Sequence, residues 1–398
     1  METNDKKMYK KGLLTGVLIS LSIFMLCIIG IFIFVYRSSE VLSPRVKSKI
    51  EYLTNIIEKT YYDEVDVSKL QEGLYKGLVE GLGDKYSTYY SPEEATEFSS
   101  HISGEFCGLG ATLTQNSDGT VEVRKVYEGS SAQDIGLKVG DIIIAADDKI
   151  AATMELSDFT SYTRGSEGTK FELTYRSGDV EKKAIVTRKK VDIPSVSYKM
   201  LEGNIGYIEI SEFNKKTHEE YTAAINDLKA QGAKGVIFDL RFNGGGIVDS
   251  ATAILDDILP ECKIVTLAQR DKEDIVYNSD GMNSLDMPIA VLVSGRTASA
   301  AEIFAAAIRD NNYGTLIGYK TYGKGVIQTS AALEDGSVIS ITSGKYYTPN
   351  GECINEKGIE PDIEVEFEYS GDTSAGYDEM KDSQVLKAIE VINGNQSN

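Results

Sequence analysis

The chain has 398 residues, 41% of them hydrophobic and 26% charged, and a formal net charge of -20. This length exceeds one compact core, so roughly two or three domains are expected. The acidic charge argues against nucleic acid as a partner and against broad contact with an anionic membrane surface.

An uncharged apolar run near the N-terminus, residues 13–35, predicts a single-pass transmembrane anchor. At about 1.5 Å per residue a helix of this length can cross a bilayer. Four lysines precede the run, so the positive-inside rule predicts a cytoplasmic tail at residues 1–12 and an extracytoplasmic body. A cleaved signal peptide is the alternative, but the run is long for one and no A-x-A site follows Val35.

The next segment, residues 43–103, has the pattern of amphipathic helices. Apolar residues recur at steps of three and four, as at Leu70, Leu74, Leu78 and Leu82. Apolar stripes of this kind could pair two subunits, so a homodimer through these helices is one expectation.

Residues 104–190 change to short β segments separated by turns, which predicts a compact β-rich domain. Its first segment contains a glycine-rich loop at Gly108, Leu109, Gly110 and Ala111. Backbone amides in such a loop could hold a peptide C-terminus while the following strand pairs with the peptide. A glycine-rich entry to a strand is the plainer alternative.

Strands and helices alternate over residues 191–369, which predicts a layered α/β domain. A polar tail with one amphipathic stretch is expected at residues 370–398. The whole chain is therefore predicted to be an α/β multi-domain protein.

Ser299 is a candidate nucleophile because it follows an apolar strand and begins a helix of small residues. Free N–H groups at a helix N-terminus can stabilise an oxyanion. An ordinary N-cap serine is the alternative, and the segment alone favours it.

Lys324 is the candidate base, since a desolvated lysine can activate a serine. Its pKa must fall from about 10.4 to roughly 7 to 8, which requires burial away from acidic groups. Residues 319–332 contain no Asp or Glu. Gln328 could orient Lys324, but a strict strand would separate the two by about 13 Å, so contact requires a turn or a bulge. An exposed turn lysine is the alternative.

Other residues offer weaker signals. Three consecutive glycines at residues 244–246 follow a buried strand. Their amides could form part of an oxyanion hole or bind a phosphate, and the plainer alternative is a loop without a binding role. His101 and His218 leave a Ser-His-Asp triad open, although nothing favours it. Cys107, Cys262 and Cys353 lack metal-ligand spacing; free thiols are expected, and a bridge between Cys262 and Cys353 is unsupported.

The motifs together resemble those of the carboxyl-terminal processing (tail-specific) proteases, S41 serine peptidases with an inserted PDZ domain. The resemblance covers residues from about 50 to 367. It rests on GEFCGLGATL and the turn RGSEGT, and then on DLRFNGGG, TASAAE, TYGKGVIQ and GKYYTPNGECINEKGIEPDIEV in that order.

The resemblance implies Ser299 as nucleophile, Lys324 as general base and Gln328 as orienting residue. It also implies an oxyanion hole from the amides of Gly245 and Ala300, with Gly244 as the neighbour that could be mistaken for Gly245. The implied core is of the crotonase/Clp-protease-like kind, without metal or nucleotide. The chain departs from the family at Thr297 and Ala301, and at Glu352 and Cys353, which puts local contacts of that last loop in doubt.

The function expected is that of a membrane-anchored extracytoplasmic serine endopeptidase that acts on proteins with apolar C-terminal tails, in a bacterium of the Gram-positive kind. Arg164, in a charged turn at a domain boundary, is a candidate regulatory residue. The alternatives are a non-catalytic PDZ adaptor on a protease-like body and an acyl-transfer enzyme on a crotonase-like core.

Overall fold

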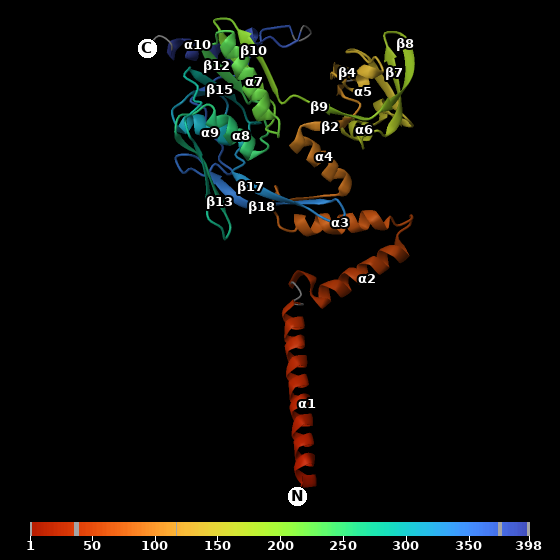
Figure 1. The fold of residues 1–398 in the computed structure, drawn as a ribbon. Helices are drawn as coiled ribbons and strands as arrows, with labels where there is room; N and C mark the ends of the chain where they lie inside the picture. The colour runs from red at the N-terminus through yellow and green to blue at the C-terminus, as the bar shows by residue number, and fades with distance from the viewer. Residues whose placement is uncertain (1, 36–39, 117, 373–375, 396–398) are drawn as a thin grey trace. The chain divides into compact units, whose positions relative to one another are not determined.

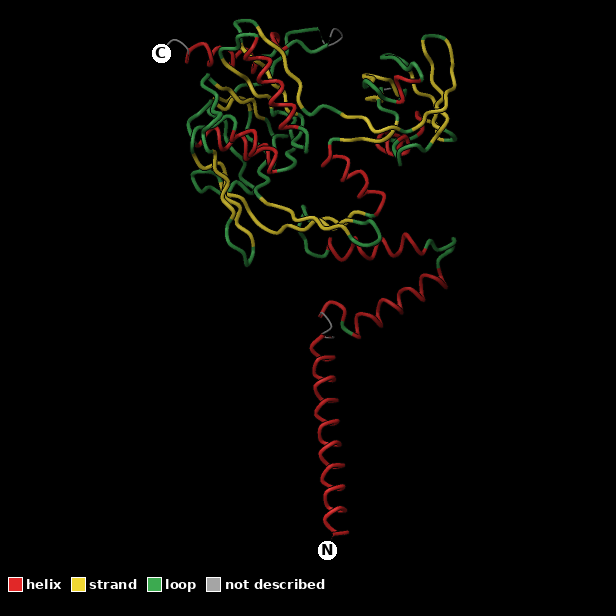
Figure 2. Tube along the Cα trace, viewed as in Figure 1, coloured by secondary structure: helices red, strands yellow, loops and turns green. Residues whose placement is uncertain are grey.

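The structure is a computed structural model that describes residues 2–35, 40–116, 118–372 and 376–395. The chain divides into two compact units, residues 1–74 and 75–398. Each unit is treated by itself below, and Figures 1 and 2 show the elements of both.

The first unit is helical. It contains α1 (Glu2–Val35), the short η1 (Glu40–Leu42), α2 (Pro44–Thr60) and the first half of α3 (Val67–Glu80). Pro44 begins α2, where a proline costs no intrahelical hydrogen bond.

Two predictions concern this unit. Across the described residues, no helix has both the length and the apolar character that a membrane span requires, so the predicted anchor at residues 13–35 is not confirmed. None of the α2 side chains is buried, and Tyr52, Leu53 and Ile56 form part of an exposed apolar stripe. The homodimer stays a prediction.

A short helix, α4 (Pro92–Ser103), precedes the β-rich domain. It begins with a capping box, in which the Ser91 N–H donates to Glu94 Oε2 at 2.9 Å and the Ser91 hydroxyl accepts from the Glu94 N–H at 3.4 Å. Gly104 ends the helix in the left-handed conformation. The helix lies within residues 43–103, where amphipathic helices were predicted.

The five predicted β segments of the next domain all form strands of one antiparallel sheet, in the order β3-β4-β5-β7-β8. The strands are β3 (Ala111–Gln115), β4 (Val121–Val126), β5 (Ile142–Ala146), β7 (Lys170–Ser177) and β8 (Val180–Thr187), with β6 (Lys149–Ile150) paired to β5. The remaining elements are β2 (Glu105–Gly108), which pairs with β9 (Lys189–Asp192), α5 (Ser131–Asp134), η2 (Ala151–Thr153) and α6 (Leu156–Thr163). Its core packs Phe159 of α6 against inward residues of the sheet, among them Val123 and Leu173.

The α/β domain is built on a six-stranded sheet in the order β10-β11-β12-β15-β16-β19. The strands are β10 (Val196–Leu201), β11 (Ile205–Ile210), β12 (Gly235–Asp239), β15 (Ile289–Val293), β16 (Thr315–Gly318) and β19 (Ile363–Glu364). From β11 onward all neighbours are parallel, as buried central strands with helical crossovers should be.

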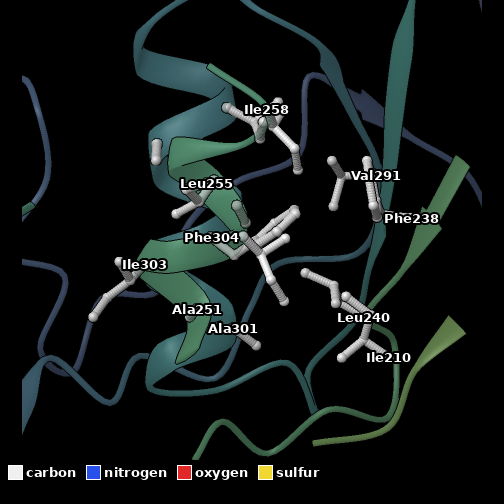
Figure 3. Close-up of a cluster of buried hydrophobic side chains, with 14 of the residues drawn as sticks. Ile210, Phe238, Leu240, Ala251, Leu255, Ile258, Val291, Ala301, Ile303 and Phe304 are labelled. Carbon is white, nitrogen blue, oxygen red and sulfur yellow. The ribbon is translucent and has the colours of Figure 1, made fainter. Parts of the chain in front are cut away.

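Successive strand residues point to opposite sides of this sheet, so each strand contributes side chains to both faces. Helices cover both faces. Phe238 and Val291 pack with α7 (Thr217–Ala230), α8 (Val248–Asp256) and α9 (Ala300–Asp310) in one core cluster. Figure 3 shows Phe304 of α9 lying toward these two strand residues.

The alternate residues of the same strands, Ile237 and Leu292, pack with α10 (Ser383–Asn395) in a second core cluster. Val385, Ala388 and Ile392 of α10 are fully buried there. The amphipathic stretch expected in the C-terminal tail or helix at residues 370–398 lies in α10, and α10 is a layer of the α/β domain.

A second sheet joins this domain to the segment before α4. Its central strand is β18 (Val338–Tyr347), which pairs with β1 (Thr88–Tyr90), β13 (Cys262–Gln269) and β17 (Val326–Ala332), while β14 (Ile275–Ser279) pairs with β13. The long β17–β18 ribbon is visible in Figure 2. This pairing places residues 88–90 beside β18, the strand that also pairs with β17, which follows Lys324.

Candidate active site

Ser299 lies between the buried strand β15 and α9, where it is the N-cap residue. Its backbone has φ of +56° and ψ of -120°, a region that non-glycine residues rarely adopt and that indicates local strain. The Thr297 side chain supports this turn, since its Oγ1 accepts from the Ser294 N–H at 2.9 Å and donates to the Leu240 carbonyl at 2.8 Å. The half-buried Ser299 is therefore held at a fixed, strained position at a helix N-terminus.

Glu302 connects the backbones of the two predicted catalytic residues. Its fully buried carboxylate accepts from the N–H of Ser299 at 2.9 Å and from the N–H of Lys324 at 2.8 Å. It also accepts from the Gly323 N–H at 2.7 Å and the Thr321 hydroxyl at 2.5 Å. Burial raises the pKa of Glu302, and these four hydrogen bonds act against that rise.

Sequence reasoning missed Glu302, although a signal was present. A serine at the N-cap followed three residues later by a glutamate is the pattern of a capping box. That pattern explains the bond to Ser299, but nothing in the sequence indicates that the same carboxylate also binds the Lys324 segment.

Lys324 is half-buried, and burial lowers the pKa of its ammonium from the ordinary value. The charges of Asp84 and Glu302 act in the opposite direction. Asp84 and Glu302 come from other parts of the sequence, so the absence of Asp and Glu from residues 319–332 did not reveal them. Within the described residues, the Lys324 Nζ has no hydrogen-bond or ion-pair partner, and it lies 5.1 Å from the centre of the Tyr86 ring.

A cavity of about 410 Å³ brings the predicted catalytic residues together. Ser299, Lys324 and Gln328 all line it. The β17–β18 pairing shifts register between Ile327 and Gln328, which is the kind of irregularity that the spacing of Lys324 and Gln328 requires. The Gln328 amide donates to Thr342 Oγ1 at 3.3 Å, so its hydrogen bond in this structure is not to Lys324.

The two predicted oxyanion-hole amides differ in their hydrogen bonding. Among the described residues, the Ala300 N–H has no acceptor, as expected for the first residue of a helix. The Gly245 N–H instead donates to Asn243 Oδ1 at 2.8 Å. A Cβ at Gly245 would lie 2.7 Å from Ser299 Cβ, so glycine permits this close approach. Gly244 lines the cavity.

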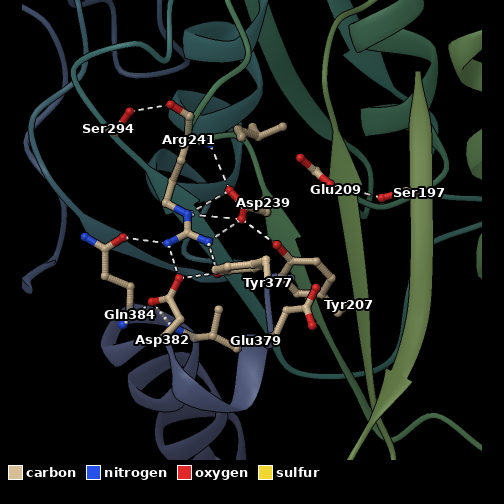
Figure 4. A network of polar contacts seen from close by, with 12 residues as sticks. Ser197, Tyr207, Glu209, Asp239, Arg241, Ser294, Tyr377, Glu379, Asp382 and Gln384 are labelled. Carbon is tan, nitrogen blue, oxygen red and sulfur yellow. Dashed lines mark hydrogen bonds and ion pairs between the residues drawn. The ribbon is translucent and has the colours of Figure 1, made fainter. Parts of the chain in front are cut away.

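A buried polar network fixes the start of the glycine loop, as Figure 4 shows. The Arg241 guanidinium pairs with Asp239 and with Asp382, each at 2.6 Å. It also donates to Gln384 Oε1 at 2.9 Å and to the Tyr377 hydroxyl at 3.0 Å. Residues from the C-terminal segment therefore hold the residue that begins this loop.

The predicted carboxylate loop lies at the end of β2. Among the described residues, the N–H groups of Leu109 and Gly110 have no acceptor, while their carbonyls accept from Ala132 and Tyr127. Gly110 has φ of +76°, and a Cβ there would lie 2.3 Å from Ser130 Cβ. The loop therefore presents free amides, as a carboxylate site requires.

Arg164 lines the small pocket beside this loop. Its guanidinium forms an ion pair with Glu97 of α4 and lies 5.1 Å from the centre of the Phe106 ring. An anion in the pocket would compete with Glu97 for this charge.

The remaining candidates have the following places. His101 lines the same cavity as Ser299, and its Nδ1 lies 3.7 Å from Glu212 Oε2. His218 lies on α7, away from the cavity, where it contacts Asp257. The three described cysteines, Cys107, Cys262 and Cys353, are free and partly buried, so no bridge joins Cys262 to Cys353.

Comparison with known proteins assigns three parts of the chain. Residues 204–365 match peptidase family S41, residues 122–177 match the PDZ domain, and residues 37–94 match the N-terminal domain of the activating protease CtpB.

Two relatives are similar over most of this chain. A Bacillus subtilis protein named "Carboxy-terminal processing protease CtpA" is 36% identical over 313 residues, which are 78% of this chain and 67% of that protein. A Staphylococcus haemolyticus protein named "Probable CtpA-like serine protease" is 33% identical over 320 residues, 80% of this chain. The chain spans 64% of the length of that relative. A crystal structure of a Bacteroides fragilis protein assigned to the S41 proteases shares the fold, with 16% identity, a TM-score of 0.53 and coverage of 80% of this chain and 90% of that one.

Proposed function

Since this chain belongs to peptidase family S41, we propose that it is a serine endopeptidase in which Ser299 is the nucleophile and Lys324 the general base. The observation that carries the proposal is the hydrogen bonding of Glu302. One buried carboxylate holds the backbones of both residues, so that both side chains line one cavity. An ordinary N-cap serine and an exposed turn lysine would have no reason to share such a support.

In the proposed mechanism, neutral Lys324 takes the proton from Ser299 Oγ as this oxygen attacks the substrate carbonyl carbon. The lowered pKa of Lys324 raises the fraction of neutral amine at working pH. The C–N bond then breaks, the departing amine receives the proton, and an ester to Ser299 remains. A water molecule deprotonated by Lys324 hydrolyses this ester and restores the serine.

The oxyanion formed in these steps needs at least one preorganised donor. The Ala300 N–H supplies one, since it is free and adjacent to Ser299. The Gly245 N–H becomes a second donor only when it leaves Asn243 Oδ1, so we propose that this exchange accompanies substrate binding. Gln328 would complete the site by orienting Lys324 after leaving Thr342.

We propose that the substrates are proteins with apolar C-terminal tails. The free N–H groups of Leu109 and Gly110 would hold the tail carboxylate, and β3 would pair with the peptide. Arg164 would respond to tail binding, because the bound carboxylate would compete with Glu97 for the charge of the Arg164 guanidinium.

The location follows from the sequence. We propose that the catalytic body lies outside the cytoplasm and that residues 13–35 anchor it, since lysines precede this uncharged apolar run. The side chains of Leu13 to Leu26 are exposed, as a lipid-facing surface would be.

The alternative, a non-catalytic PDZ adaptor, would need neither a strained Ser299 nor a lysine with a lowered pKa. Both features favour the enzyme.

The test is cleavage of an unfolded protein with an apolar free C-terminus, compared with its C-terminally amidated twin, by residues 37–398 and by the Ser299→Ala variant. Cleavage of the free tail by the wild type alone supports both the nucleophile and tail capture. Equal cleavage of both twins would contradict tail capture, and cleavage by Ser299→Ala would contradict the nucleophile.

A further inference from the structure

The segment before the β-rich domain contributes a tyrosine to the catalytic cavity. Tyr86 lies on a turn that is fixed at both ends. The Asp84 carboxylate accepts from the Ser87 hydroxyl at 2.6 Å and from the Tyr86 N–H at 3.3 Å. The Ser87 hydroxyl in turn accepts from the Thr342 N–H of β18 at 3.0 Å. The turn is thus attached to the strand that pairs with the Lys324 segment.

This attachment gives Tyr86 a defined place in the site. Tyr86 lines the cavity that Ser299 and Lys324 line, and the Lys324 Nζ lies 5.1 Å from the centre of its ring. The Lys85 Nζ lies 4.6 Å from the same ring centre. The ring therefore forms one wall of the cavity beside the base.

The hydroxyl of Tyr86 is buried and makes no hydrogen bond of normal geometry among the described residues, although the Lys85 ammonium is near enough to interact with it. Native proteins rarely keep a buried hydroxyl without a well-formed hydrogen bond. The proposed mechanism gives this hydroxyl no role, and the Lys324 Nζ, 5.1 Å from the centre of the same ring, likewise has no hydrogen-bond or ion-pair partner among the described residues. Two such polar groups on residues that line one cavity indicate a site that a polar ligand completes.

We propose that Tyr86 is a further substrate-binding residue of the active site, whose hydroxyl donates a hydrogen bond to a backbone carbonyl of the peptide next to the scissile bond. The inference rests on the proposed peptidase function. A peptide that enters the cavity loses water from its carbonyl groups, and each then needs a donor from the protein. A tyrosine hydroxyl can donate without charge, so it would satisfy such a carbonyl without disturbing the neutral form of Lys324.

The hydroxyl can be tested apart from the ring. Tyr86→Phe keeps the ring beside Lys324 and removes only the donor. Tyr198→Phe is the control, because Tyr198 lies on β10 and does not line the cavity. The two variants and the wild type are compared by kcat/KM on a quenched fluorescent peptide with an apolar free C-terminus. A melting curve for each protein measures any general loss of structure.

Tyr86→Phe is expected to lower kcat/KM about 5-fold, the contribution of one neutral hydrogen bond, while its melting temperature does not fall and Tyr198→Phe keeps the wild-type activity. A kcat/KM equal to that of the wild type would overturn the inference and leave the peptidase function intact.

A binding measurement separates failure of the inference from failure of the proposed function. Proteins that carry Ser299→Ala, with and without Tyr86→Phe, are titrated with the amidated form of the same peptide, which lacks the carboxylate that the loop at Leu109 would hold. A Kd about 5-fold weaker with Tyr86→Phe supports the contact even if the wild type cleaves nothing. Equal affinity overturns it.

Discussion

Glu302 holds together two chain segments that are about twenty residues apart, and it does so through backbone N–H groups. Neither Ser299 nor Lys324 is positioned by its own side chain in this structure; both are positioned through this carboxylate. Since a carboxylate only accepts hydrogen bonds, all of its donors can be satisfied at once. Glu302 is therefore a positioning residue for Ser299 and Lys324, the proposed catalytic pair.

Glu302→Gln should show this directly. The glutamine amide group would face an N–H donor, leaving a buried donor unsatisfied at a cost of about 1 to 3 kcal/mol in the free energy of unfolding. We expect kcat to fall at least about 10-fold with little change in KM, because the pair is displaced while the peptide groove is not. Steady-state kinetics and urea unfolding measure the two effects.

The control is Glu390→Gln, which alters an exposed ion pair with Lys387 on α10 and should change neither quantity by much. An unchanged kcat in Glu302→Gln, with stability lowered, would restrict Glu302 to a structural role.

Single residues differ in how far the sequence reveals them. Ser299 and Lys324 were proposed from the sequence through the order of motifs that carries the family resemblance, since the local setting of each residue alone favours an ordinary N-cap serine and an exposed turn lysine. Tyr86 was not proposed, because its place in the cavity depends on strand pairing between β1 and β18, which are about 250 residues apart. The acids near Lys324 were missed for the same reason: Asp84 and Glu302 reach it only through the fold.

Among the elements, α10 shows why a periodic stretch near a chain end is hard to assign. Its amphipathic pattern was recognised, but a pattern does not say which surface it covers. In the structure, α10 packs on Ile237 of β12 and Leu292 of β15. Asp382, the residue before α10, accepts a hydrogen bond from Arg241. The C-terminal segment therefore takes part in positioning the glycine loop that ends at Gly246.

Asp382→Asn tests this element. Removing one partner of a buried, paired arginine typically costs about 3 to 5 kcal/mol in the free energy of unfolding. Because Arg241 begins the loop that carries the Gly245 amide, we also expect kcat to fall while the affinity for an amidated peptide is retained. Urea unfolding, kinetics and a peptide titration provide the readouts.

Glu360→Gln is the comparison, since Glu360 pairs with Lys320 at an exposed position and should contribute about 0 to 1 kcal/mol. If Asp382→Asn lost stability but kept the wild-type kcat under folding conditions, the network would support the fold alone.

At the scale of the whole molecule, the resemblance to the carboxyl-terminal processing proteases is confirmed by the family matches and the relatives. That prediction rested on the order and spacing of the motifs, which are visible in the sequence without knowledge of any three-dimensional contact. The ion pair between Arg164 and Glu97 could not be predicted in this way, because it joins residues far apart in the sequence.

Arg164→Ala is expected to lower the stimulation of cleavage by a free tail carboxylate without lowering the melting temperature. The reason is that the partly exposed ion pair with Glu97 contributes little to stability, whereas the guanidinium would sense the bound tail. The measurement is the ratio of cleavage rates for the free and amidated twins. A ratio equal to that of the wild type would remove Arg164 from regulation.

The central claim is that Lys324 is the base that activates Ser299, and it is tested most directly by the pH dependence of kcat/KM for the wild type and Lys324→Met. Burial lowers the pKa of Lys324, so the neutral base is present above that pKa and activity should rise with pH through a value below 10.5. Lys324→Met should be inactive at every pH. A Lys324→Met variant that keeps pH-dependent cleavage would contradict the claim.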